Sequence, residues 1–252
     1  MHKKSLMMTL ILMGLCFSAP AWAVDANEVV NRAHEYFRGQ ASFSVVEMRI
    51  HRPDWERGMT LKAYTQGLSD SIFFVIDPPK DEGNGTLKKG DEMWMYNPKV
   101  NRVIKVPPSM MSQSWMGSDF SNNDLAKSDA ILKHYQHSLE KTEERDGHKV
   151  YIIKSMPKEG APVVWGMQRL EIRDDDVWMS QEFYDEDLEL VKALTTQKIK
   201  QMGGRLFPAV WRMQKADAKN AYTQVTYQEL RFMEDLPDRI FTVSNLRNPR
   251  DF

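Results

Sequence analysis

Alternation of apolar and polar residues, repeated along most of the chain, is the feature that most constrains its fold. Val46, Met48 and Ile50 alternate with polar residues, which is the period of a β-strand with one buried face. Similar stretches recur up to residue 232, separated by turn signals such as Asp146-Gly147. We count roughly eleven strands joined in sequence order by short hairpins, a spacing that predicts a sandwich or a barrel.

Two segments depart from this pattern and predict helices. Residues 25–40 place apolar side chains at helical spacing, and Gly39 ends that helix. Residues 107–131 form an apolar insert that is not strand-like and that ends in a short helix over 124–131. Because no linker or low-complexity tract interrupts the chain, we expect residues 24–252 to form one mainly β domain with helices (α+β).

The first 23 residues are typical of a cleavable secretory signal peptide. Lys3 and Lys4 supply its positive start, residues 6–17 its short apolar stretch, and Ala21-Trp22-Ala23 its small-x-small cleavage site. The pattern therefore predicts export, with the folded domain beginning at Val24.

The chain has one cysteine, Cys16, which lies inside this signal. Lipidation at a signal cysteine needs a small preceding residue, and Leu15 is bulky, so we expect an exported periplasmic protein that is not lipidated. A mature chain without cysteine suits an oxidising compartment. A single cysteine also excludes an intrachain disulfide framework and a cysteine-based zinc site.

Composition excludes several functional classes. The formal net charge is -1, which argues against a nucleic-acid partner, since such proteins carry a basic excess. A hydrophobic fraction of 42% argues against disorder. After the signal, no apolar run approaches the roughly 20 residues that span a bilayer.

No arrangement of residues indicates catalysis or a cofactor. The chain has neither a P-loop nor a dinucleotide-binding glycine motif, and Ser118 lacks the context of a hydrolase nucleophile. His134 and His137 point to opposite sides of a strand, so they cannot share a metal ion there. Acidic groups such as residues 174–176 coincide with turns. We therefore predict a protein that is not an enzyme and has no metal or cofactor site.

Apolar side chains gather where a solvated loop would not need them. Trp94 and Tyr96 share one face of a strand, while Met93 and Met95 share the other, so this strand is apolar on both sides. The insert carries large apolar residues among serines. Ordinary core packing explains any one of these residues, but the insert as a whole also suits a lid over the sheet or a partner-binding surface.

Several motifs resemble the LolA-like family of outer-membrane lipoprotein-sorting proteins, in a branch distinct from LolA itself. The most specific is Ser114-Trp115-Met116-Gly117-Ser118-Asp119-Phe120-Ser121, followed by Asp124-Leu125. Residues 90–98, 182–185 and 204–208, and the closing Phe241-Thr242 to Leu246, match in family order. The resemblance implies an incomplete antiparallel β-barrel whose concave face is covered by helices.

The resemblance also implies a function and a set of residues. It implies a periplasmic carrier that shields acyl chains of a lipoprotein or lipid in a hydrophobic hollow during transfer towards the outer membrane. Its partners would be an inner-membrane ABC or RND-type transporter and an outer-membrane acceptor. The candidate lipid-binding residues of the hollow are Val46, Met48, Ile50, Phe74, Trp94 and Tyr96, and those of the lid or partner contact are Met111, Trp115, Met116 and Phe120.

Two points stay open at this stage. A lid-locking arginine would be expected in the family, and Arg49, Arg52, Arg57 and Arg102 are all candidates. The alternative function is a regulatory or sensor module of the same fold that acts by protein contact, like the RseB-like periplasmic regulators of envelope stress.

Overall fold

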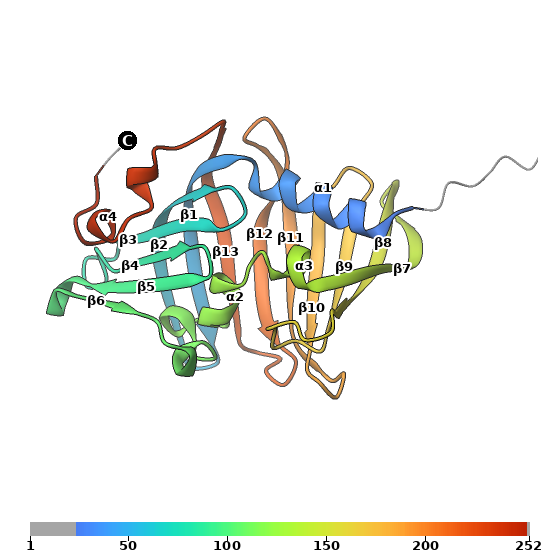
Figure 1. The fold of residues 1–252 in the computed structure, drawn as a ribbon, viewed down its shortest axis with the longest axis horizontal. Helices are drawn as coiled ribbons and strands as arrows, with labels where there is room; N and C mark the ends of the chain where they lie inside the picture. Colours follow the sequence, from blue (N-terminus) through green and yellow to red (C-terminus); the bar gives the residue numbers. More distant parts are fainter. Residues whose placement is uncertain (1–23, 251–252) are drawn as a thin grey trace, which may run out of the picture.

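Thirteen antiparallel strands form one strongly curved sheet in the computed structural model, which describes residues 24–250 (Figure 1). The strand order is β6-β5-β4-β3-β2-β1-β13-β12-β11-β10-β9-β8-β7, and the two edge strands β6 and β7 do not pair with each other in the described part of the chain. The predicted incomplete antiparallel barrel is therefore confirmed, with thirteen strands in place of roughly eleven.

The elements have the following bounds. The strands are β1 (Ala41–Arg52), β2 (Trp55–Gln66), β3 (Asp70–Asp77), β4 (Gly85–Lys89), β5 (Glu92–Asn97), β6 (Arg102–Lys105), β7 (Tyr135–Arg145), β8 (His148–Pro157), β9 (Met167–Arg173), β10 (Trp178–Tyr184), β11 (Leu190–Met202), β12 (Arg205–Lys215) and β13 (Tyr222–Met233). The helices are α1 (Ala26–Arg38), α2 (Asn122–Ala126), α3 (Ala130–His134) and α4 (Val243–Arg247). The predicted signal peptide, residues 1–23, lies outside the described residues.

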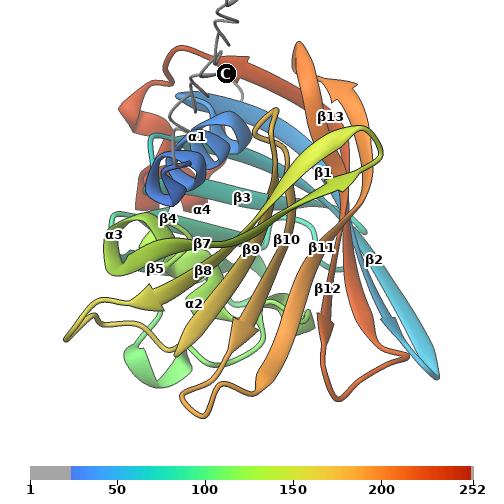
Figure 2. The same cartoon turned by 90° about the vertical axis from the view of Figure 1, so that its right-hand side faces the viewer.

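Helix α1 begins and ends where the sequence predicts. The Asp25 carboxylate accepts a hydrogen bond of 2.8 Å from the amide of Asn27, and Gly39 ends the helix with a positive φ of 66°. The apolar face of α1 packs against β7, β9 and β10, on the inner side of the curved sheet (Figures 1 and 2). The insert between β6 and β7, which contains α2 and α3, covers the other half of the same face.

The outer face of the sheet is covered differently. The segment after β13, including α4, packs its buried Leu236, Phe241 and Leu246 against the outer side of β3, β4 and β5. Helices therefore lie on both sides of the sheet: of the four described helices, α1, α2 and α3 lie on its inner side and α4 on its outer side. Within residues 24–250, no helix combines the length and hydropathy that crossing a membrane would require.

Candidate functional site

A cavity of about 350 Å³ lies between the inner face of the sheet, α1 and the insert. This volume is within the range of ligand-binding pockets, roughly 300–1,000 Å³. Most of its lining is apolar and comes from all parts of the fold. The apolar lining residues are Phe37, Val46, Met48, Leu61, Ala63, Phe73, Trp115, Phe120, Leu125, Ala130, Ile131, Tyr135, Val163, Val164, Trp165, Trp178, Phe183, Leu194, Phe207, Trp211, Met213, Val225, Tyr227 and Leu230.

Strand alternation explains why β1 contributes to this lining. Val46 and Met48 point to the inner face, where Val46 stands opposite Leu61 of β2 and Tyr227 of β13. Both predicted residues line the cavity. Ile50 shares their face and is fully buried, but it packs beneath the insert and does not border the cavity. Their role in lipid binding stays a prediction.

The placement of Phe74, Trp94 and Tyr96 in the hollow is wrong. Phe74 stands opposite Gly85 of β4, which in turn stands opposite Tyr96 of β5, so these side chains share one face. That face is the outer one, where Phe74, Trp94 and Tyr96 pack with the C-terminal segment. Strand β5 is apolar on both sides because both sides are covered, and its period alone does not say which side faces the hollow.

The inner face at this point is formed by the alternate residues. Phe73 stands beside Ala63 and lines the cavity, and Met93 and Met95 pack under the insert. The sequence therefore located the correct strands but the opposite set of side chains.

Two of the four predicted lid residues border the cavity. Trp115 is buried, its indole N–H donates a 3.0 Å hydrogen bond to the Thr86 hydroxyl, and its ring meets Phe73 edge-on at 5.7 Å. Phe120 lines the cavity and is half-buried. Met111 and Met116 are half-buried against the core under the insert and do not line this cavity.

Local conformation explains the placement of Met116. Its φ of 52° is followed by a φ of 77° at Gly117, so the chain turns sharply between Trp115 and Ser118. The Ser118 hydroxyl closes that turn by donating to the Trp115 carbonyl oxygen at 2.7 Å. The turn directs Trp115 inward and Met116 towards a second pocket beside β5 and β6.

The insert is anchored by its aspartates, which recur every five residues. Asp119 is almost fully buried and pairs with Arg52 of β1 through two bonds, Nη2–Oδ1 at 3.0 Å and Nη1–Oδ2 at 3.1 Å. It also accepts a 2.7 Å hydrogen bond from the Thr223 hydroxyl of β13. Of the four arginine candidates, Arg52 is the one that holds the insert, while Arg49 pairs with Glu47 and Glu56, and Arg57 with Asp81.

The other two aspartates pair with lysines on different strands. Asp124 binds the amino group of Lys192 from β11, which lies over the Trp165 ring at 5.0 Å. Asp129 binds Lys88 from β4 at 3.2 Å, and both side chains are 2% exposed. The insert is thus tied to three separated strands by three ion pairs, each with a buried carboxylate.

One end of the cavity is polar and lies where α1 meets the insert and the turn between β2 and β3. His34, Arg38, Ser42, Ser71 and Lys127 are among its lining residues. Burial lowers the pKa of His34 to about 4, with a further contribution from the Arg38 charge, so the imidazole is neutral at pH 7.

The ion pair between Lys88 and Asp129 lies beside this polar end, and the pKa values of both side chains are shifted. Burial lowers the pKa of Lys88. Burial alone would raise the pKa of Asp129, but a hydrogen bond from Lys133 and the charge of Lys88 lower it overall. Asp129 therefore stays ionised in its buried position.

Sequence reasoning missed two parts of the lining. The loop between β8 and β9 contributes Val163, Val164 and Trp165, for which the signal was an apolar run between Pro162 and Gly166. The polar end was missed because His34 and Arg38 occur on an amphipathic helix among many other charged residues.

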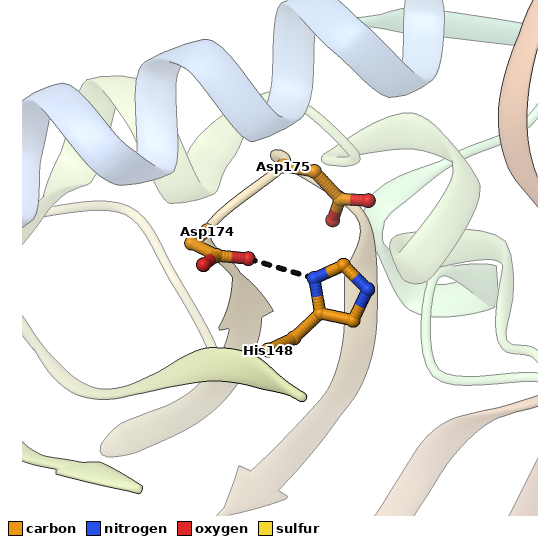
Figure 3. Close-up of side chains that lie close together, drawn as sticks. All are labelled: His148, Asp174 and Asp175. Carbon is orange, nitrogen blue, oxygen red and sulfur yellow. Dashed lines mark hydrogen bonds and ion pairs between the residues drawn. The ribbon is translucent and has the colours of Figure 1, made fainter. Parts of the chain in front are cut away.

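A cluster of possible metal ligands lies on the surface, away from the cavity (Figure 3). His148, Asp174 and Asp175 bring one ligand atom each to within 4.8 Å of the others. However, His148 Nδ1 already lies 3.0 Å from Asp174 Oδ1, and Asp175 is paired with Arg173. These partners satisfy the carboxylates without a metal ion, so we assign no metal site here.

Comparisons place the chain among proteins of this fold. A family model described as an uncharacterized protein matches residues 67–248. None of the curated proteins matches the chain. In structure, the chain is similar to a DUF1329 family protein from Desulfovibrio piger, with 24% identity, coverage of 88% of this chain and 100% of the other, and a TM-score of 0.78.

Two further structures are similar over the same share of the chain. One is a domain from Vibrio parahaemolyticus described as an outer membrane lipoprotein-sorting protein, with 19% identity, 88% and 98% coverage and a TM-score of 0.77. The other is a LolA superfamily protein from Nitrosomonas europaea, with 24% identity, 88% and 99% coverage and a TM-score of 0.73. At these identities the similarity shows the fold.

Proposed function

We propose that this chain is a periplasmic carrier of acyl chains: it belongs to the family of uncharacterized proteins whose model matches residues 67–248, and it shares the fold of a LolA superfamily protein and of an outer membrane lipoprotein-sorting domain. The cargo is a lipoprotein or a lipid, whose chain occupies the cavity under the insert during transfer towards the outer membrane.

The observation that carries this proposal is the apolar cavity itself. Four tryptophans, Trp115, Trp165, Trp178 and Trp211, line it together with aliphatic side chains from β1, β2 and β13. Exposing a CH₂ group to water costs about 0.8 kcal/mol, so an acyl chain of about sixteen carbons costs on the order of 10 kcal/mol in bare water. An apolar cavity that takes up the chain removes most of that cost and needs no covalent chemistry.

The insert gives the cavity a means of opening. Its contacts with the sheet include three buried ion pairs, and buried ion pairs contribute less net stability than their geometry suggests because each charge has lost its water. Separating Asp119 from Arg52 and Asp124 from Lys192 returns these charges to water, which offsets part of the cost of opening. We propose that cargo enters and leaves by this movement.

The predicted signal peptide supports a periplasmic location, and a periplasmic carrier needs a donor and an acceptor. We propose an inner-membrane ABC or RND-type transporter as the donor and an outer-membrane protein as the acceptor. The regulatory alternative uses the same fold but would act through protein contact.

Native mass spectrometry of residues 24–252, purified from a periplasm, tests the proposal. Organic extraction of the co-purifying material should yield a phospholipid, a fatty acid or an acylated peptide. Ser44 is buried and lines the cavity, so Ser44→Phe should reduce the bound fraction, whereas Ser109→Phe on the exposed surface should not. A clean apo mass, with no uptake of added lipid or lipopeptide, would contradict the carrier and favour the regulatory alternative.

A further inference from the structure

We propose that the cavity recognises the head of its ligand as well as the chain. In this proposal Arg38 and His34 of α1, with Ser71 of β3, form a site for a carboxyl group, and the preferred ligand is a fatty acid. The inference rests on the proposed function, because a head-group site of this kind serves only if an acyl chain fills the rest of the cavity.

Arg38 lines the cavity and forms no ion pair with a carboxylate of the described residues. Its Nε donates to the Gly67 carbonyl oxygen, and its Nη2 donates to the Asp70 carbonyl oxygen at 2.7 Å and to the Ser71 hydroxyl at 3.1 Å. All three acceptors are neutral, and over residues 24–250 no hydrogen bond engages Nη1. Burial lowers the pKa of Arg38, which is the expected cost of a desolvated charge.

The surrounding charges leave this end of the cavity positive. The Asp129 carboxylate is shared by two cations, Lys88 at 3.2 Å and Lys133 at 2.6 Å. The Asp70 carboxylate accepts from the Ser69 hydroxyl at 3.0 Å and from the Gly90 amide at 3.3 Å. Lys127, which also lines this end, pairs with Asp91 at 3.6 Å, so three carboxylates face four cations, and an anion supplied by a ligand would restore neutrality where water is scarce.

His34 supplies the second half of the site. It lies one helical turn before Arg38 on the same face of α1, it is 8% exposed, and it lines the cavity. Its Nδ1 is buried and has no hydrogen-bond partner among the described residues. A buried nitrogen of this kind costs free energy until a ligand or water pairs with it.

A single carboxylate can pair with the Arg38 guanidinium and with His34 Nδ1 at the same time. One carboxylate oxygen accepts from Arg38 Nη1, and the other accepts from His34 Nδ1 in the neutral tautomer that carries its proton on that nitrogen. Guanidinium pairs with carboxylate and with phosphate alike, but a carboxylate carries one negative charge, which matches the single excess positive charge, whereas a phosphate monoester carries nearly two. The cavity volume of about 350 Å³ lies near the lower end of the range for ligand pockets, which suits one chain better than two or three.

Calorimetric titration of residues 24–252 with dodecanoic acid, its methyl ester and dodecyl phosphate tests the inference. The three ligands share a chain and differ only in the head. We expect the acid to bind at least about tenfold more tightly than the ester, as one charge-assisted hydrogen bond supplies this difference. Arg38→Gln should abolish the preference and leave the affinity for the ester unchanged, while Arg32→Gln, on the exposed face of α1, should change neither.

The outcomes separate the head-group site from the carrier function. Equal affinities for the acid and the ester in the wild type would overturn the head-group site and leave the carrier standing. Tighter binding of dodecyl phosphate would overturn the assignment to a carboxyl group. Binding of none of the three ligands would overturn both proposals. The wild-type comparison decides the question even if Arg38→Gln fails to fold.

Discussion

Replacing Asp119 with asparagine tests whether buried ion pairs hold the insert closed. The side chain keeps its shape but loses its charge, so Arg52 loses its anionic partner and faces an amide group instead. Removing one partner of a fully buried pair costs about 3–5 kcal/mol. Because the Arg52 side chain is 20% exposed and retains access to water, we expect the lower value of about 2–3 kcal/mol for the closed insert.

Hydrogen exchange measures this loss locally. Three amides report on the insert: Asp119, which donates to the Thr223 hydroxyl at 2.9 Å, Trp115, which donates to the Phe120 carbonyl at 2.8 Å, and Asn122, which donates to the Gln113 carbonyl at 2.9 Å. A change of about 2–3 kcal/mol corresponds to a fall in protection of roughly 30- to 150-fold at these amides. Protection in β9, β12 and β13 should stay within a few-fold of the wild type.

An exposed pair provides the matched control. Glu47 pairs with Arg49 at 2.6 Å on the surface of β1, and Glu47→Gln should leave protection of the insert unchanged. Unaltered exchange across residues 107–134 in folded Asp119→Asn would refute the reasoning. So would an equal loss of protection throughout the sheet, since it would mean that the pair stabilises the whole fold and not the insert.

Three further changes test other parts of the structure. Phe120→Asp should weaken binding of a fluorescent fatty acid about 10- to 100-fold, because apolar contact with the chain is lost. Phe43→Asp, on the outer face of the sheet, should leave binding unchanged. Equal effects of the two substitutions would show that Phe120 is not part of the lid. The pKa of His34 is about 4 in the folded protein and about 6.5 in the unfolded chain, so its contribution to stability is present above pH 6.5 and is lost as the pH falls towards 4. Between pH 7 and pH 5, the free energy of unfolding should therefore fall by about 2 kcal/mol more in the wild type than in His34→Gln. Equal falls in the two proteins would contradict the assignment. A Cβ on Gly166 would lie 2.3 Å from the Asp185 carbonyl oxygen, so Gly166→Ala should cost about 1–3 kcal/mol in thermal unfolding, and an unchanged melting temperature would show that the loop shifts freely.

The strand pattern and the position of the insert could be predicted from the sequence, because local periodicity and turn chemistry determine them. The period of β1 was sufficient to group Val46 and Met48 on one face, since they alternate with the polar Glu47 and Arg49. In β5 the same reasoning failed, because both faces are buried and the side that meets the C-terminal segment depends on contacts nearly 150 residues apart.

The residues that close the cavity depend on tertiary contacts in the same way. Arg52 lies 67 residues before Asp119, and Lys192 lies 68 residues after Asp124, so neither pair leaves a local signal. The five-residue spacing of Asp119, Asp124 and Asp129 was visible in the sequence, but acidic residues in a loop are ordinarily solvated. Only the fold shows that each one meets a cation on a different strand.

Quenching of tryptophan fluorescence by a brominated fatty acid tests the central claim most directly. Trp115, Trp165, Trp178 and Trp211 line the cavity, while Trp55 is 51% exposed at the β1–β2 turn. If an acyl chain occupies this cavity, the brominated acid should quench most of the emission saturably, and the same acid without bromine should compete. Quenching that is absent, or that is confined to the exposed Trp55, would contradict the account.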